Sequence, residues 1–121
     1  IVLYQCPKGF SMAFINLLLL LLMGHFLGDF ALQNGRMARE KCAGPNHSLP
    51  WGYWLTAHGA IHGLIVALLT GVPLLGLAEW LVHMLIDWGK CRNLYRLPVD
   101  QSLHLFSKAI WTLLAIVVFA V

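Results

Sequence analysis

The sequence predicts an all-α fold, an integral membrane four-helix bundle with four transmembrane helices and short loops. Two features of the sequence indicate this fold. Of the 121 residues, 60% are hydrophobic and only 11% are charged, whereas soluble domains are about 45–50% apolar and about 25% charged. The apolar residues also gather into four runs, and one membrane crossing needs about 20 such residues. This composition excludes an ordinary soluble globule and a disordered tail.

The predicted helices follow the apolar runs in order, at residues 12–33, 55–70, 74–88 and 103–121. The second run ends just before Pro73, because proline lacks an amide donor and clashes with the preceding turn. Residues 34–54 are rich in glycine and proline and are expected to form a loop with little regular structure. Residues 89–102, which contain Pro98, are expected to form the next long loop.

Residues 12–121 are predicted to form a single four-helix transmembrane domain. Residues 1–11 are expected to be a non-native or disordered N-terminal extension, because Met12 directly precedes the first apolar run. The three cysteines, Cys6, Cys42 and Cys91, are odd in number and lack a C-x-x-C spacing. Neither a disulfide framework nor a thiolate zinc site is therefore expected.

The lysines and arginines cluster in the two long loops and predict an orientation. The first loop carries Arg36, Arg39 and Lys41, and the second carries Lys90, Arg92 and Arg96. Because cytoplasmic loops carry an excess of Lys and Arg, residues 34–54 and 89–102 are expected to be cytoplasmic. Lys108 is expected to extend toward the same headgroups. The sequence has no run of five basic residues, so nucleic-acid binding is not expected.

Polar residues that interrupt the spans fall four positions apart. These steps join His25 to Asp29, His58 to His62, Glu79 to His83, His83 to Asp87, and Asp100 to His104. A step of four places two side chains on one helix face, and in lipid that face must turn into the bundle. The expected topology brings these residues to one level in the cytoplasmic leaflet, except Glu79, which lies deeper.

Imidazole and carboxylate groups on facing helices are typical ligands of zinc, manganese or iron. The sequence therefore predicts one or two divalent transition-metal ions in this layer. The candidate ligands are His25, Asp29, His58, His62, His83, Asp87 and His104. Gln33, Gln101 and Lys90 could orient ligands or hold an anionic substrate. A single such pair is more often an interhelical hydrogen bond, but four sets at one depth favour a functional site.

Four short motifs follow one another along the chain. They are HxxGDxxLQ from His25, HxxxH from His58, HxxxDxxK from His83 and DQxxH from Asp100. The ordered series resembles domain-of-unknown-function family 3307, small membrane proteins of bacteria and phages, over residues 13–119. The resemblance implies a multi-pass protein of the bacterial inner (cytoplasmic) membrane and implies no activity. A more distant similarity to small membrane-bound metal-dependent hydrolases rests on architecture and is analogy only.

Three functions fit these observations. The first is a metal-dependent hydrolase of a lipid-like substrate, with an ion-activated water as nucleophile, Asp100 or Glu79 as general base and Lys90 on a phosphate. The second is a metal or proton carrier or sensor. A carrier needs access from both sides of the membrane, and Glu79 is the only candidate site residue in the outer half, which argues against it. The third is an accessory structural subunit of a membrane complex. Membrane lipid is an expected partner, together with a homo-oligomer or a larger membrane complex.

Overall fold

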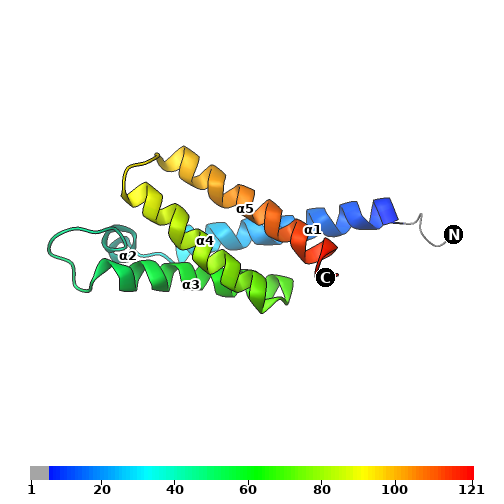
Figure 1. Ribbon diagram of the computed structural model, residues 1–121, viewed down its shortest axis with the longest axis horizontal. Helices are drawn as coiled ribbons and strands as arrows, with labels where there is room; N and C mark the ends of the chain where they lie inside the picture. Colours follow the sequence, from blue (N-terminus) through cyan, green and yellow to red (C-terminus); the bar gives the residue numbers. More distant parts are fainter. Residues whose placement is uncertain (1–5) are drawn as a thin grey trace.

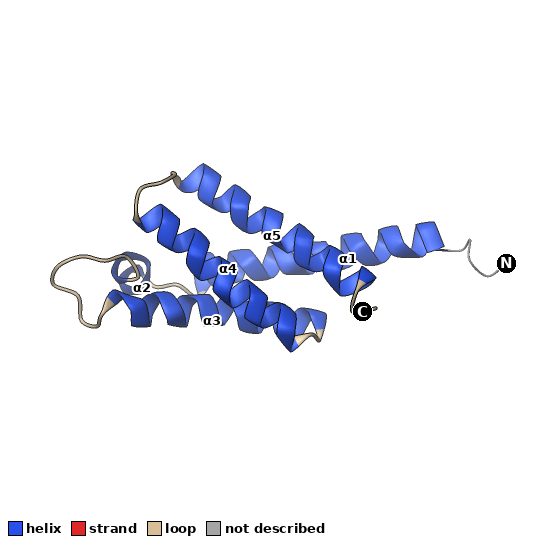
Figure 2. Cartoon of the chain, viewed as in Figure 1, coloured by secondary structure: helices blue, strands red, loops and turns tan. Residues whose placement is uncertain are grey.

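The computed structural model describes residues 6–121, and all regular structure in that range is helical (Figure 1, Figure 2). The long helices are α1 (Cys6–Phe26), α3 (Trp51–Thr70), α4 (Pro73–Cys91) and α5 (Leu97–Val117). A π-helical turn, η2 (Leu27–Ala31), continues α1, and a short helix, α2 (Gly35–Glu40), follows it. The all-α prediction is confirmed. The expected extension at residues 1–11 is described only from residue 6, where α1 begins.

Helices α1 and α3 run nearly along the long axis of the molecule, and α4 and α5 are inclined to them (Figure 1). Helix α2 and the α4–α5 loop occupy one end of the molecule, and the α3–α4 turn lies at the other end with the C-terminus. Helix α3 packs against α4, and α1 packs against α5, while α4–α5 and α1–α3 contacts complete the arrangement. The two long loops therefore share one end, which is called the loop end below.

The long helices begin earlier than the apolar runs indicate, α1 at Cys6 and α4 at Pro73 among them. Helix α3 begins at Trp51 and α5 begins at Leu97, although the runs begin at residues 55 and 103. Proline is tolerated in the first helical turn, because amides there have no intrahelical acceptor. Pro98 occupies such a position in α5. As a result Asp100 lies in the first turn of a helix, which fixes its position relative to His104.

The first loop is more ordered than its composition predicts. Asn34 caps α2, because its side chain accepts a hydrogen bond of 2.8 Å from the Met37 amide. Met37 and Glu40 are buried, and Ser48 donates both its amide and its hydroxyl to the Glu40 carboxylate. Burial acts to raise the pKa of Glu40, but the hydrogen bonds from Ser48 hold that pKa below its usual range. The expectation of little regular structure was therefore wrong at residues 35–40.

An apolar core occupies the half of the molecule away from the loop end. Its buried members are Leu17, Leu21, Val66, Leu75, Trp111 and Ala115. Helices α3 and α4 approach closely in this half, where a Cβ at Gly63 would lie 2.6 Å from the Gly76 carbonyl oxygen. A backbone atom cannot move aside as a side chain can, so glycine is required there for the two helices to pack.

Among the described residues, two segments are long and apolar enough to cross a membrane, Gly9–Ala31 and α3. Helices α4 and α5 have similar lengths but contain charged residues. All of those charges but Lys90, which is half-buried, are turned inward: Glu79, Asp87, Asp100 and Lys108 are each at most 2% exposed. The outward positions of α4 and α5 are instead apolar, as at Leu81, Leu85, Phe106 and Ile110.

Candidate metal centre

The four long helices bring their polar pairs together in the interior, on the loop-end side of the apolar core. His25 comes from α1 and Asp29 from η2, His58 and His62 from α3, His83 and Asp87 from α4, and Asp100 and His104 from α5. All eight side chains are at most 7% exposed. The structure therefore brings together all seven predicted ligands, and Asp100 joins them.

A four-residue set has the spacing of a tetrahedral metal site. The Asp29 Oδ1 atom lies 3.0 Å from His62 Nε2, 3.2 Å from His58 Nε2 and 3.6 Å from His83 Nε2. The His58 and His83 Nε2 atoms are 3.2 Å apart. Ligand bonds of about 2.0–2.1 Å, as in zinc sites, place tetrahedral ligand atoms about 3.3 Å apart. These four residues are called the first set below.

Two atoms of the first set are buried without a hydrogen bond. Asp29 Oδ1 and His62 Nε2 form a close ion-pair contact of 3.0 Å with each other, but neither makes a hydrogen bond within the described part of the chain. Buried polar groups are normally satisfied, because an unpaired one loses its hydration without compensation. A bound cation would satisfy both atoms, so the donor set fits a divalent transition metal.

The π-helical turn η2 positions Asp29 in the first set. Within it the Leu32 amide donates to the Leu27 carbonyl at 2.9 Å, five residues back instead of the usual four. Such turns inserted in α-helices are frequent at functional sites. Gly28 lies in the same turn, and a Cβ there would lie 2.6 Å from the His62 ring. Gly28 therefore makes room for a candidate ligand.

Glu79, one helical turn before His83 in α4, orients the His83 ring. The Glu79 Oε1 atom accepts from His83 Nδ1 at 3.1 Å and from Lys108 Nζ at 2.6 Å, and Oε2 accepts from Trp111 Nε1 at 2.6 Å. An ionised carboxylate only accepts, so the His83 proton is on Nδ1 and the Nε2 lone pair faces the first set. Because both Glu79 oxygens are engaged, this geometry favours a positioning role over proton abstraction.

Lys108 does not reach the headgroups as expected. Its side chain is 1% exposed and is bonded to Glu79. The attraction of a buried carboxylate outweighs the gain from extending the ammonium into water.

Gln101 joins the helices on the other side of the first set. Its Oε1 lies 3.0 Å from His25 Nε2, and its Nε2 donates to Asp29 Oδ2 at 2.8 Å and to Asp100 Oδ2 at 3.1 Å. Gln33 also supports this turn, through a hydrogen bond of 2.7 Å to the Asp29 carbonyl. Both glutamines thus contact candidate ligands, as the sequence predicts.

The four sequence motifs contain all eight side chains of the buried cluster, two from each motif. The model of the family of proteins of unknown function DUF3307 matches residues 17–120. This chain belongs to the DUF3307 family. No match was found among curated proteins or among solved structures. The family assigns no activity, so the function of this DUF3307 member is argued from its site.

Lys41 is the site residue that the sequence did not single out. Its Nζ lies 2.7 Å from Asp87 Oδ2, and the side chain is only 7% exposed. The sequence indicated only a loop residue that sets orientation, because the fold of residues 34–54 was not predictable. Lys90, expected at a phosphate, is half-buried and has no ion pair with the described cluster. Lys41 therefore holds the place beside the centre that the sequence assigned to Lys90.

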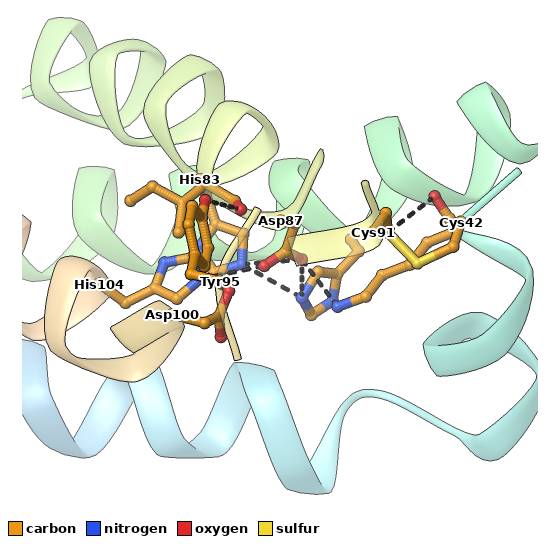
Figure 3. The surroundings of a disulfide bond; sticks show 10 residues. Cys42, His83, Asp87, Cys91, Tyr95, Asp100 and His104 are labelled. Atoms are coloured by element: carbon orange, nitrogen blue, oxygen red, sulfur yellow. Dashed lines mark hydrogen bonds and ion pairs between the residues drawn. A yellow bond between two sulfur atoms is a disulfide. The ribbon is translucent and has the colours of Figure 1, made fainter. Parts of the chain in front are cut away.

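A disulfide between Cys42 and Cys91 lies beside this ion pair (Figure 3). The two Cα atoms are 5.1 Å apart, although the cysteines are 49 positions apart in sequence. The expectation of no disulfide was wrong for this pair, because the fold of α2 brings Cys42 to the end of α4. Cys42 follows Lys41, and Cys91 lies one helical turn after Asp87. The disulfide and the ion pair thus fasten α2 to α4 next to the centre.

We expect Gly28→Ala to lower metal affinity by about tenfold or more, the effect of losing a group that orients a ligand. The added methyl group would displace the His62 ring. Zinc titration of the purified variant measures the effect. Gly35→Ala is the matched control, because a Cβ there meets no atom within 4 Å. Equal affinities for the two variants would contradict the assignment of His62 as a ligand.

Proposed function

We propose that this DUF3307 chain is a membrane-embedded, metal-dependent hydrolase that acts on a lipid-like substrate. The supporting observation is the buried first set, whose ligand atoms lie within 4.8 Å of one another and whose Asp29 Oδ1 and His62 Nε2 atoms are buried without a hydrogen bond. A bound zinc, manganese or iron ion would lower the pKa of a water molecule toward neutrality and polarise an ester or phosphoester oxygen. Glu79 and Gln101 would hold the ligands in place.

The distribution of charge supports four membrane crossings. Among residues 9–121 the exposed charged side chains are Arg36, Arg39, Arg92 and Arg96, all at the loop end. Helices α4 and α5 present leucine, phenylalanine and isoleucine outward and bury their charged side chains, except Lys90 at the loop end of α4. A large apolar surface is unfavourable in water, whereas a surface that faces lipid must be apolar. The proposal therefore places all four long helices in the bacterial inner membrane.

Surface grooves at the loop end suit a lipid-like substrate. An apolar groove of about 510 Å³ lies between α3 and α4, lined by Leu55, Leu81 and Leu85 among others. Trp51 and Trp88 line both this groove and a second cavity of about 370 Å³ that also contains Arg92. Tryptophan favours the membrane–water boundary. An acyl chain in the apolar groove would place its headgroup at the level of Asp87, the neighbour of Trp88 in α4.

The apolar half of the molecule, away from the loop end, favours a hydrolase over a carrier. A carrier needs a polar path to both sides of the membrane. Beyond Glu79 and Lys108 the described interior is the apolar core around Leu21, Val66 and Leu75. The buried Thr70 and Thr112 hydroxyls there donate to backbone carbonyls of their own helices. This core separates the centre from the end opposite the loops, so access is expected from the loop end alone.

The test is hydrolysis by the metal-loaded chain in lipid vesicles. Ester and phosphoester lipids would be supplied, and the released headgroup or fatty acid would be measured. We expect product with the wild-type chain and none with Asp29→Asn or after chelation. Glu40→Gln is the control, because Glu40 lies in α2 and contacts Ser48 instead of the centre. Metal transport into sealed vesicles without hydrolysis would favour the carrier, and neither activity in a metal-bound chain would favour an accessory subunit.

The orientation of the loop end is proposed from its arginines. The excess of Lys and Arg in residues 34–54 and 89–102 supports a cytoplasmic position for both loops. Disulfides are typical of oxidising compartments, and those that form in the cytosol are usually transient or redox-sensing. We therefore infer that Cys42 and Cys91 are reduced in growing cells and join on oxidation.

This inference predicts the thiol content of the protein in cells. After acid quenching, a maleimide reagent should label Cys42 and Cys91 in untreated cells, because the cytoplasm keeps thiols reduced. Treatment with the oxidant diamide should abolish that labelling, and dithiothreitol should restore it. Cys6→Ser removes the remaining cysteine from the count. A bond that is already complete in untreated cells would place the loop end on the outer side.

A further inference from the structure

Three buried side chains of α4 and α5 form a second ligand set beside the first (Figure 3). The His104 Nε2 atom lies 3.0 Å from Asp87 Oδ1 and 3.5 Å from Asp100 Oδ1. The three side chains are at most 2% exposed. Asp87, Asp100 and His104 are called the second set below.

The second set has an unsatisfied anionic atom. Asp100 Oδ1 is buried and has no hydrogen-bond partner in the described residues, while Oδ2 accepts from Gln101. The ammonium of Lys41 contacts Asp87 Oδ2 at 2.7 Å, whereas His104 contacts the other oxygen, Oδ1. A carboxylate without water or a cation is costly in a protein interior. The second set therefore has the donor atoms and the charge that attract a divalent cation.

Asp87 contacts both sets. Its Oδ1 atom faces His104, and its Oδ2 atom lies 3.3 Å from the His58 Nε2 atom of the first set. A carboxylate shared in this way is suited to two-metal hydrolases, whose ions lie about 3.5–4 Å apart.

We propose that the second set holds a second divalent ion, and that this ion binds the reacting water. The proposal rests on the proposed function, since it concerns the same centre. The first set supplies four protein ligands, whereas the second set supplies three and so leaves a fourth position for a water molecule. Asp100 and His104 also lie at the start of α5, on the side that the α4–α5 loop reaches. The second set therefore includes residues next to the α4–α5 loop, at the end where the substrate headgroup is expected.

The chemistry at that position is hydrolysis without any redox change. The water oxygen forms a bond to the acyl carbon or the phosphorus of the substrate, and the ester C–O or P–O bond breaks. The proton released by the water goes to the leaving alcohol oxygen. No further co-reactant is needed.

Metal stoichiometry tests the inference. The chain in lipid nanodiscs would be stripped with chelator, reloaded with Zn²⁺ or Co²⁺ and analysed by plasma mass spectrometry. We expect two ions per wild-type chain and one per Asp100→Asn chain, which keeps the shape of the side chain. Glu40→Gln should keep two. Circular dichroism of each variant reports whether the helices persist.

Three outcomes separate this inference from the proposed function. Two ions in wild type and one in Asp100→Asn support both. One ion in both chains overturns the second site and leaves the first set in place. No ion in folded wild-type chain overturns both. If Asp100→Asn fails to fold, His104→Gln replaces it, with the same single ion expected and two ions contradicting the inference.

Discussion

Lys108→Met should destabilise the folded chain by about 3–5 kcal/mol, the cost of removing one partner of a buried ion pair and leaving the other charge unpaired. Lys108 is 1% exposed and Glu79 is fully buried, so the substitution leaves a carboxylate whose remaining donors are His83 and Trp111. Methionine fills much of the lysine volume, which limits the loss of packing. Unfolding in mixed detergent micelles, followed by circular dichroism, measures the change in free energy.

The double variant Lys108→Met with Glu79→Gln identifies the cause. It removes both charges and keeps hydrogen-bonding capacity at position 79, so most of the lost stability should return. Lys90→Met is the matched control, because Lys90 is half-buried and has no ion pair among the described residues. If the double variant were no more stable than Lys108→Met alone, the buried charge would not be the cause.

His58→Ala should reduce metal affinity by more than about 100-fold, the upper end of what losing an outer-shell partner costs. His58 Nε2 lies 3.2 Å from Asp29 Oδ1 and 3.3 Å from Asp87 Oδ2, so it contacts both sets. Alanine removes the imidazole ligand from between the Asp29 and Asp87 carboxylates, which then repel each other without a group to separate them. Competition with a zinc-binding dye measures the affinity.

His47→Ala is the control for this variant. His47 is the histidine that lies outside the cluster, in the loop after α2, near Gly44. It should bind zinc as tightly as wild type does. Similar losses in His47→Ala and His58→Ala would indicate that zinc binds at the surface.

The sequence predicted the helices and the candidate ligands because both depend on local spacing. Steps of four residues place His58 with His62 and His83 with Asp87 on common helix faces. Because lipid cannot solvate polar side chains, these faces must point into the bundle. The helix starts were less predictable, because Pro98 interrupts the apolar pattern of α5 and yet fits its first turn. Asp100 therefore joined the ligands, although it was predicted as a base.

The contacts that the sequence missed are tertiary. Lys41 and Cys42 lie in a loop whose fold depends on the Asn34 cap and on buried Met37, and no periodicity marks them as neighbours of Asp87 and Cys91. Lys108 and Trp111 lie on the inward face of α5, but only the packing of α5 on α4 directs both to Glu79. These residues could be recognised once the helices were in place.

The metal content of the wild-type chain tests the central claim most directly. The chain would be purified from cells grown in metal-containing medium, without chelator, and the zinc, manganese and iron per chain would be counted by plasma mass spectrometry. The buried His/Asp cluster predicts at least one ion per chain, retained through size-exclusion chromatography. A folded chain that carries no transition metal, and that takes up none when Zn²⁺, Mn²⁺ or Fe²⁺ is added, would contradict the account.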